Sequence, residues 1–169
     1  MAPPEFTDPV EKIRGLLRTD EDAEAGAAVA ILLNLSAEGL RVLLVKRTVN
    51  PSDPWSGDMA FPGGKRHPED RTLRDTVFRE TMEETGIDLR GCRLLGSMEI
   101  DSSNINPKII VQPFVLMCDG EPKVRLSGEL CDHLWIPLEH LRRSRGMTWV
   151  RQLDVPAYLV RGEVIWGLT

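Results

Sequence analysis

A run of acidic residues just before a glycine, RETMEETG at positions 79–86, constrains the fold of this chain more than any other feature. At about 100° per residue, the carboxylates of Glu80, Glu83 and Glu84 fall within an arc of roughly 100° on one side of an α-helix. Gly86 is suited to end that helix, because glycine readily adopts the left-handed conformation of a C-terminal cap. The sequence therefore predicts a helix with one acidic face that ends near residue 86.

The remaining surface of this helix is mostly apolar. Val77, Phe78, Thr81 and Met82 occupy a different arc from the glutamates. We therefore expect these four residues to be buried, while the glutamates point out toward a cleft.

Crowding like charges in this way has a cost. Carboxylates three or four residues apart destabilise a helix by about a few tenths of a kcal/mol per pair, and by more where they are partly desolvated. Arg79 can pair with Glu83, but one arginine cannot neutralise three carboxylates. A divalent cation can, because hard ions such as Mg²⁺ and Mn²⁺ bind carboxylate oxygens and bridge them to phosphates. The alternative is a solvated acidic face, which is what most glutamate runs in helices are.

The segment before the helix favours the ion site. FPGGK, at positions 61–65, supplies two consecutive glycines. Gly63 and Gly64 can adopt backbone angles closed to other residues, and they let a carbonyl or an amide approach an ion or a phosphate. A solvated surface helix requires neither this loop nor an arginine beside the acids.

The rest of the chain is predicted to form short strands and few helices. The expected elements are a helix within 8–18 capped by Asp8, a hairpin over 27–47, a long functional loop at 48–58, strands within 92–100 and 108–118, a change from strand to helix at Pro137, and a closing hairpin that turns at 161–163. Strands that outnumber helices without alternating regularly with them indicate a mixed sheet packed by a few helices, hence an α/β fold. We expect a single domain over 1–169, with 1–24 as an N-terminal helical extension.

Charge and hydropathy exclude several functional classes. The net charge of −5 argues against broad attraction to nucleic acid or to an anionic membrane. The longest apolar stretch, at 25–35, is too short to span a bilayer, and the first residues do not resemble a signal peptide. We therefore expect a cytoplasmic protein that binds neither nucleic acid nor membrane. Its three cysteines, Cys92, Cys118 and Cys131, are odd in number and widely spaced, and are interpreted as reduced, core or half-buried thiols.

The stretch from Gly64 to Ile87 resembles the Nudix box of the Nudix hydrolases. That pattern runs Gly, five residues, Glu, seven residues, then Arg-Glu, a hydrophobic residue, any residue, Glu-Glu, any residue, Gly and a hydrophobic residue. Here Gly64 is followed by five residues and Asp70, and then by eight residues and RETMEETGI. The departures are Asp70 for glutamate, one extra residue before Arg79, and Thr81 at the hydrophobic position. They put in doubt any role for Asp70, but not the acidic set.

The resemblance implies a fold, a cofactor and a reaction. The family fold is an α/β/α sandwich with a mixed sheet, and its members split the diphosphate of a nucleoside diphosphate linked to another group. By resemblance, Mg²⁺ or Mn²⁺ would be held by Glu80, Glu83, Glu84 and the carbonyl of Gly64, and Arg79 would orient a glutamate. The general base would be Glu83 within the box or Glu129 on a later loop, and for Glu129 a plain loop acid is the alternative.

The segment before the box is similar to that of the coenzyme A diphosphatases, a group within this family. A double leucine, an arginine, a glycine and FPGG recur in order, although Ser52 stands where that group has a second arginine. Coenzyme A is therefore the leading substrate, with ADP-ribose, dinucleoside polyphosphates, nucleotide sugars or a non-catalytic nucleotide sensor as alternatives. A homodimer is also frequent in the family. The candidate substrate-binding residues are Arg47, Trp55, Lys65, Arg66 and Lys108.

Overall fold

In the computed structural model, which describes residues 8–102 and 108–169, most of the predicted elements are present. Residues 103–107, within the expected polar connection before the strand at 108–118, lie outside the described residues. The described elements are, in chain order, α1 (Pro9–Arg14), β1 (Ala27–Ser36), β2 (Gly39–Arg47), β3 (Met59–Ala60), β4 (Gly63–Lys65), α2 (Leu73–Thr85), the 3-10 turn η1 (Leu89–Gly91), β5 (Cys92–Ser97), β6 (Asp101–Ser102), β7 (Ile110–Cys118), β8 (Leu130–Pro137), α3 (Leu138–Arg143), β9 (Arg145–Val150), β10 (Leu153–Val160) and β11 (Glu163–Trp166).

The main sheet is organised around the predicted β1–β2 hairpin, whose strands separate at one end. The two strands pair only from Leu33 to Ser36 on β1. Beyond that point β1 pairs with β4, and β2 pairs with β3. The short segment from β3 to β4 therefore occupies the fork between the two long strands. This fork places β4, which contains the two predicted glycines, in contact with α2.

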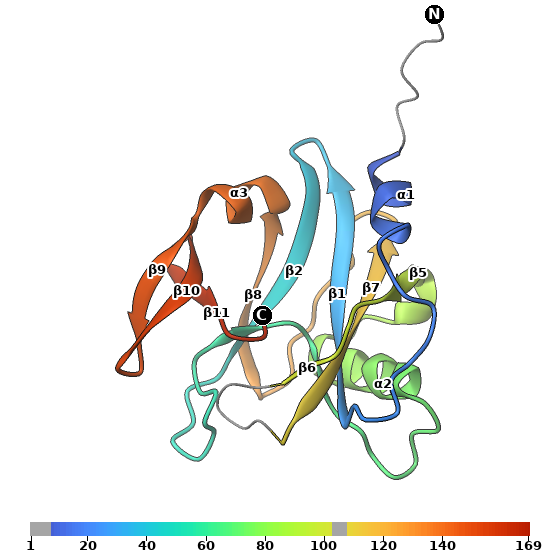
Figure 1. Cartoon of the computed structure of the whole chain (residues 1–169), viewed down its shortest axis with the longest axis horizontal. Coiled ribbons are helices and arrows are strands. Elements are labelled where there is room, and N and C mark those ends of the chain that lie inside the picture. The colour runs from blue at the N-terminus through green and yellow to red at the C-terminus, as the bar shows by residue number, and fades with distance from the viewer. Residues whose placement is uncertain (1–7, 103–107) are drawn as a thin grey trace, which may run out of the picture.

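The sheet is mixed, as predicted. β1 and β7 are parallel, and the other described pairs of its strands are antiparallel. The strand order is β3-β2-β1-β7-β5, with β8 on the outer edge of β2. Figure 1 shows α2 on one side of this sheet and α1 and α3 toward the other. The layers are those of an α/β/α sandwich.

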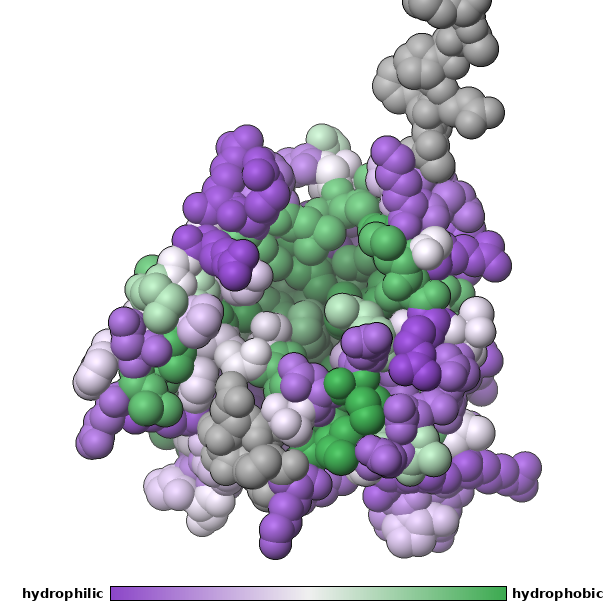
Figure 2. All heavy atoms as spheres, in the orientation of Figure 1, coloured by the Kyte–Doolittle hydropathy of each residue, from purple (hydrophilic) through white to green (hydrophobic). Residues whose placement is uncertain are grey.

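Alternation along the strands builds the two cores on either side of the sheet. Leu32 of β1 and Leu116 of β7 pack with Val77 of α2. Their neighbours Leu33 and Val115 face the opposite side, where they pack in a cluster that includes residues of α1 and α3. Figure 2 views this second side, where apolar side chains gather in a hollow over β1 and β2 between α1 and α3.

A second, three-stranded sheet of order β11-β10-β9 completes the described fold. The closing hairpin is confirmed as β10 and β11, which turn at Arg161 and Gly162. Strand β9 was not predicted. It packs through its partner β10, whose Val160 joins Ile165 and Ile136 in a small core. This sheet lies beside β3 and brings the end of β11 close to the loop at 48–58.

Local signals explain where the helices begin and end. The side chain of Asp8 accepts a hydrogen bond from the amide of Val10, so the predicted cap of α1 is confirmed. At α2, the side chain of Thr72 accepts from the amide of Asp75, whose carboxylate in turn accepts from the amide of Thr72. Gly86 ends this helix in the left-handed conformation, as predicted.

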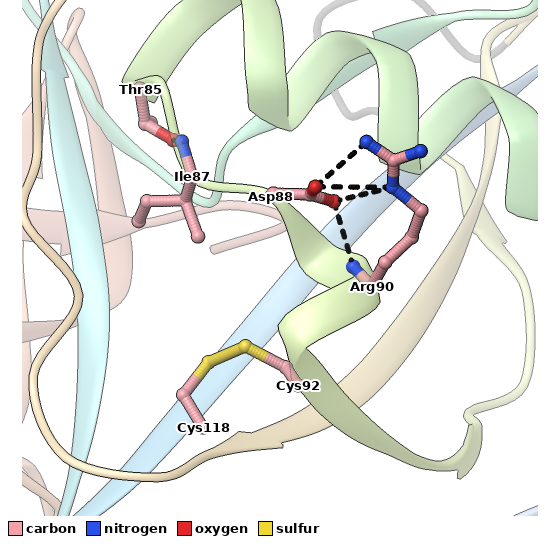
Figure 3. Close-up of a disulfide and its surroundings, with 6 residues drawn as sticks. All are labelled: Thr85, Ile87, Asp88, Arg90, Cys92 and Cys118. Carbon is pink, nitrogen blue, oxygen red and sulfur yellow. Dashed lines mark hydrogen bonds and ion pairs between the residues drawn. A yellow bond between two sulfur atoms is a disulfide. The ribbon is translucent and has the colours of Figure 1, made fainter.

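The prediction that all three cysteines are reduced, core or half-buried thiols is wrong. Cys92 and Cys118 form a disulfide, and Cys131 is an exposed free cysteine. Cys92 begins β5 and Cys118 ends β7, and the antiparallel register sets these residues directly opposite each other, with their Cα atoms 4.4 Å apart. Sequence spacing gave no sign of this pairing, because the strand register creates it. Figure 3 shows the disulfide beside η1 and the end of α2.

None of the helices in the described part of the chain has the length and apolar character needed to cross a bilayer.

Candidate active site

A pocket of about 870 Å³ opens at the fork of the β1–β2 hairpin. One part of its lining is formed by the carboxylates of α2 and the glycines of β4. Another part comes from the loop at 48–58 and the last four residues of the chain, and a third is apolar and comes from β1 and β7. The predicted site residues in its lining are Arg47, Trp55, Gly64, Lys65, Glu80, Glu83, Glu84 and Glu129.

The two glycines of β4 permit a very close approach of the backbone to its surroundings. Gly63 has φ +147°, and a Cβ there would collide with the carbonyl oxygen of Ala28. At Gly64, a Cβ would lie 2.5 Å from the carboxylate carbon of Glu80. The first glycine is thus required by the backbone of β1, and the second leaves room for the carboxylate of Glu80.

Glu84 is buried, with 6% of its surface exposed. Its side chain accepts a hydrogen bond of 2.9 Å from the amide of Gly63. Burial and, less strongly, the nearby charge of Glu80 raise the pKa of Glu84 to about 7, although the amide of Gly63 opposes the shift. Glu84 lines the pocket together with Glu80 and Glu83, as expected, but its side chain is buried where the helix meets the glycine corner.

Two positions of α2 that were expected to be buried, Thr81 and Met82, differ in exposure. Met82 was expected to be buried but is 39% exposed. Thr81, at the hydrophobic position of the box, is fully buried, and its hydroxyl has no hydrogen-bond partner among the described residues. The position therefore behaves as an apolar one, which explains how the box tolerates threonine there.

Asp70 anchors the arginine of the box. Its carboxylate accepts bonds of 3.1 and 2.8 Å from Nε and Nη2 of Arg79, and also accepts from the His67 amide and the Thr76 hydroxyl. These bonds, chiefly that from Arg79, hold the pKa of Asp70 well below its ordinary value. Asp70, whose role the sequence left in doubt, therefore contacts the arginine of the box directly.

Arg79 links Asp70 to the glutamates of the acidic face. Its Nη1 donates to Glu80 at 2.8 Å and to Glu83 at 3.3 Å. Its pKa is raised, mainly by the hydrogen bond to Asp70. The guanidinium thus contacts Glu80 and Glu83, two of the three box glutamates.

The carboxylate and carbonyl oxygens at this corner are of the type that binds a divalent cation. Their present arrangement, however, is not that of a metal site. Among residues 8–102 and 108–169, no three acidic, histidine or cysteine side chains are arranged to hold a metal ion. Glu80 and Glu83 are turned toward Arg79, whereas Glu84 is a buried carboxyl held by one amide. A hard cation at this corner would offset the burial of Glu84, and Glu80, Glu83 and the Gly64 carbonyl are the further oxygen groups that would help to hold it.

The predicted base and cations outside the box are placed as follows. Glu129 is exposed in the pocket lining, and its negative charge contributes to the raised pKa of Glu84. Its carboxylate makes no hydrogen bond or ion pair within the part of the chain that the structure describes. Arg47 donates from Nε to Asp53 at 2.7 Å and lowers the pKa of Glu84 through its charge. Lys65 is exposed at the pocket margin, and its carbonyl accepts from Arg79.

Two predicted substrate-binding residues are not part of this lining. The guanidinium of Arg66 donates to the carbonyls of Asp70 and Arg71, which stabilises the loop before α2. Lys108 is exposed, and its neighbour Ile109 lines the pocket.

The sequence interpretation missed Asp58 and Trp166. Both line the pocket, and the indole Nε1 of Trp166 donates to Asp58 at 3.4 Å. The available signal was the closing segment EVIWGLT, which supported the resemblance without suggesting a role for its tryptophan.

Comparisons with known proteins agree with this architecture. The NUDIX domain family matches residues 24–155. A protein of Schizosaccharomyces pombe is 37% identical over 107 residues, which are 59% of this chain and 32% of that protein. The Nudix hydrolase NudL of Yersinia enterocolitica is 31% identical over 83% of this chain and 74% of its own length. The human mitochondrial coenzyme A diphosphatase NUDT8 is 28% identical over 85% of this chain and 65% of its own length.

The chain therefore spans about a third of the first of these relatives and just under two thirds of the human one. Among solved structures, the Caenorhabditis elegans Ap4A hydrolase in a binary complex is similar, with a TM-score of 0.56 and 22% identity over 67% of this chain and 80% of that chain. At that identity the likeness concerns the fold. The family match, the box residues around the pocket and the α/β/α layers agree, and the chain belongs to the Nudix family.

Proposed function

We propose that this chain is a metal-dependent hydrolase of nucleoside diphosphate derivatives, with coenzyme A or its derivatives as substrate. The observation that carries the proposal is the buried carboxyl of Glu84 at the glycine corner, next to Glu80. A carboxyl with so little polar compensation is a poor structural element and a good cation ligand. The relation to a named coenzyme A diphosphatase supports the substrate, together with the LLVKR and FPGG motifs.

The reaction is the attack of water on one phosphorus of a diphosphate, which forms a new P–O bond and breaks the bond to the bridging oxygen. A cation bound by Glu80, Glu83, Glu84 and the Gly64 carbonyl would supply charge neutralisation at the phosphoryl oxygens and a lower pKa for water. Asp70 and Arg79 hold Glu80 and Glu83 in position. Arg47 and Lys65 bring positive charge to a pocket that is otherwise acidic, and are available to bind phosphates.

The water must lose a proton to a base, and two residues are candidates. Glu83 accepts a hydrogen bond from Nη1 of Arg79 at Oε2, so this oxygen is already engaged. Glu129 lies in the pocket lining, and its carboxylate makes no hydrogen bond or ion pair within the described residues. We therefore favour Glu129. Its replacement by Gln should remove the rise in rate with pH on the acidic side of the pH–rate profile, whereas Glu83→Gln should mainly raise the metal concentration required.

A substrate panel tests the proposal. Coenzyme A, ADP-ribose, dinucleoside polyphosphates and nucleotide sugars would be incubated with Mg²⁺ or Mn²⁺, and the two phosphorylated products identified. The proposal expects adenosine 3′,5′-bisphosphate and phosphopantetheine from coenzyme A, with loss of activity in a chelator. Faster cleavage of another compound would replace the substrate, and no cleavage of any member would favour a nucleotide sensor.

A matched pair of variants makes the panel specific to the site. Glu84→Gln should abolish turnover, whereas Glu38→Gln, in the exposed β1–β2 turn, should leave it unchanged. The cytoplasmic location and the homodimer expected from the sequence stay predictions.

A further inference from the structure

Besides the carboxylates of α2, the pocket lining contains two tryptophans. Trp55, on the loop at 48–58, and Trp166, at the end of β11, are both half-buried in its lining. The segments that carry them are more than a hundred residues apart in sequence. Trp55 was the residue singled out from the sequence, but the structure fixes Trp166 more firmly.

Trp166 is held at its edge and on one face. Its Nε1 donates to Oδ1 of Asp58 at 3.4 Å, and Nη2 of Arg151 donates to the other oxygen of the same carboxylate at 2.9 Å. The guanidinium of Arg151 also lies over the indole, 5.2 Å from the ring centroid. Arg151 lies over the indole and is not part of the pocket lining, whereas Trp166 is.

Asp58 connects this indole to the other functional elements of the loop. Its amide donates to the carbonyl of Trp55 at 3.1 Å, and its carbonyl accepts from the amide of Arg47 at 3.0 Å. One residue therefore holds the turn that carries Trp55, the strand that carries a candidate phosphate-binding arginine, and the ring of Trp166. The contacts with Trp55 and Arg47 are made by the backbone of Asp58, and its carboxylate binds Trp166 and Arg151.

We propose that Trp166 is a specificity-determining residue whose indole stacks on the planar base of the substrate, and that Asp58 and Arg151 are positioning residues that hold it. The inference rests on the proposed function for the class of substrate, a nucleoside diphosphate derivative. A fixed aromatic ring suits this task, because stacking on a base contributes affinity without hydrogen-bond readout, and a ring already held in place loses little entropy on binding.

The test compares a ligand that has a base with one that lacks it. Binding of adenosine 3′,5′-bisphosphate and of inorganic pyrophosphate would be measured by calorimetry for the native chain and for Trp166→Leu, Trp166→Phe and Trp149→Leu. Trp149 is the matched control, because it is 71% exposed on β9 and outside the pocket lining. We expect Trp166→Leu to weaken binding of the nucleotide roughly tenfold, with little change for pyrophosphate, and Trp166→Phe to restore most of it.

The same variants in a turnover assay should raise KM for coenzyme A with kcat largely unchanged, and Asp58→Asn should raise it less than Trp166→Leu. Nucleotide affinity that is unchanged in Trp166→Leu, or equal losses for both ligands, would overturn the inference and make Trp166 a packing residue. A native chain that does not bind the nucleotide would overturn it as well.

The two proposals fail separately. Nucleotide binding that depends on Trp166, in a chain that cleaves no diphosphate, would refute the hydrolase and support the stacking residue. Cleavage with a KM that is indifferent to Trp166 would do the reverse.

Discussion

Two buried carboxyl groups flank the acidic face of α2, Asp70 in the loop before the helix and Glu84 near its C-terminal end, and their pKa values are shifted in opposite directions. At one end Asp70 is paired with the guanidinium of Arg79 and accepts further hydrogen bonds, and its pKa is depressed. At the other end the carboxyl of Glu84 accepts a hydrogen bond from the amide of Gly63, and its pKa is raised to about 7, chiefly by burial. A buried carboxylate that is paired with a cation and hydrogen-bonded is compatible with a stable fold. A buried carboxylate with few polar partners indicates a site for a ligand of opposite charge. We therefore interpret the Asp70 end as an anchor and the Glu84 end as the cation site.

The largest expected effect is the loss of activity when Glu84, the proposed cation ligand, is replaced. Glu84→Gln should lower kcat/KM roughly a thousandfold, because it removes a charged oxygen ligand of the cation at the centre of the site. The fold should persist, since Gln can still accept from the Gly63 amide. Turnover assays and thermal melts in chelator would measure both. Retained activity would show that Glu84 is a structural carboxyl after all.

The pH dependence of stability should expose the same asymmetry. Because the pKa of Glu84 is raised in the folded state from 4.5 to about 7, the folded protein binds the extra proton between these values. In chelator, this group should therefore lower the free energy of unfolding by roughly 3 kcal/mol as pH rises from about 4.5 to above 7. Urea unfolding of the native chain and Glu84→Gln at pH 5 and pH 8 isolates the effect, because the variant should lack this loss. An equal pH slope in both proteins would contradict the assignment.

At Asp70, the pH dependence of the free energy of unfolding has the opposite sign. Asp70→Asn should lower the free energy of unfolding at neutral pH by about 2 kcal/mol, because it removes the charge that pairs with Arg79. Since the pKa of Asp70 is depressed, its contribution is present above the ordinary carboxyl value and is lost as pH falls through the folded-state pKa. Native and variant stabilities should thus converge in strong acid. A variant that kept its stability but lost all cation binding would move Asp70 into the cation site.

The smallest effect concerns the glycine corner between the two ends. Gly64→Ala would bring a methyl group against the carboxylate of Glu80, which lies at the far end of a flexible side chain and can move aside. We expect activity to fall roughly tenfold or more, with a stability change within about 1 kcal/mol. Gly26→Ala is the control, because a Cβ there has open space. Equal activity of the two variants would remove Glu80 from the catalytic geometry.

Periodicity and turn chemistry were sufficient to predict much of this arrangement. The acidic helix, its end at Gly86, the β1–β2 hairpin and the change from strand to helix at Pro137 depend on local residues, and all are present. The resemblance added the layer order of the sandwich and the identity of the box. What the sequence could not show were features that arise from register and packing.

Three examples make that limit concrete. The disulfide depends on Cys92 and Cys118 meeting across two strands. The burial of Glu84 depends on the glycine loop entering the fork of a hairpin, whereas helical spacing alone puts all three acids on an open face. Trp166 reaches the pocket through a second sheet, one strand of which was not predicted.

The central claim is that a divalent cation completes the corner formed by Glu84, Glu80 and Gly64. Anomalous diffraction from crystals soaked in MnCl₂ tests it most directly, with Glu84→Gln crystals treated in the same way. The account predicts a manganese peak in coordination contact with the Glu84 carboxylate in the native protein, and its loss or strong weakening in the variant. A pocket without manganese, with Glu80 and Glu83 still bonded to Arg79, would contradict it.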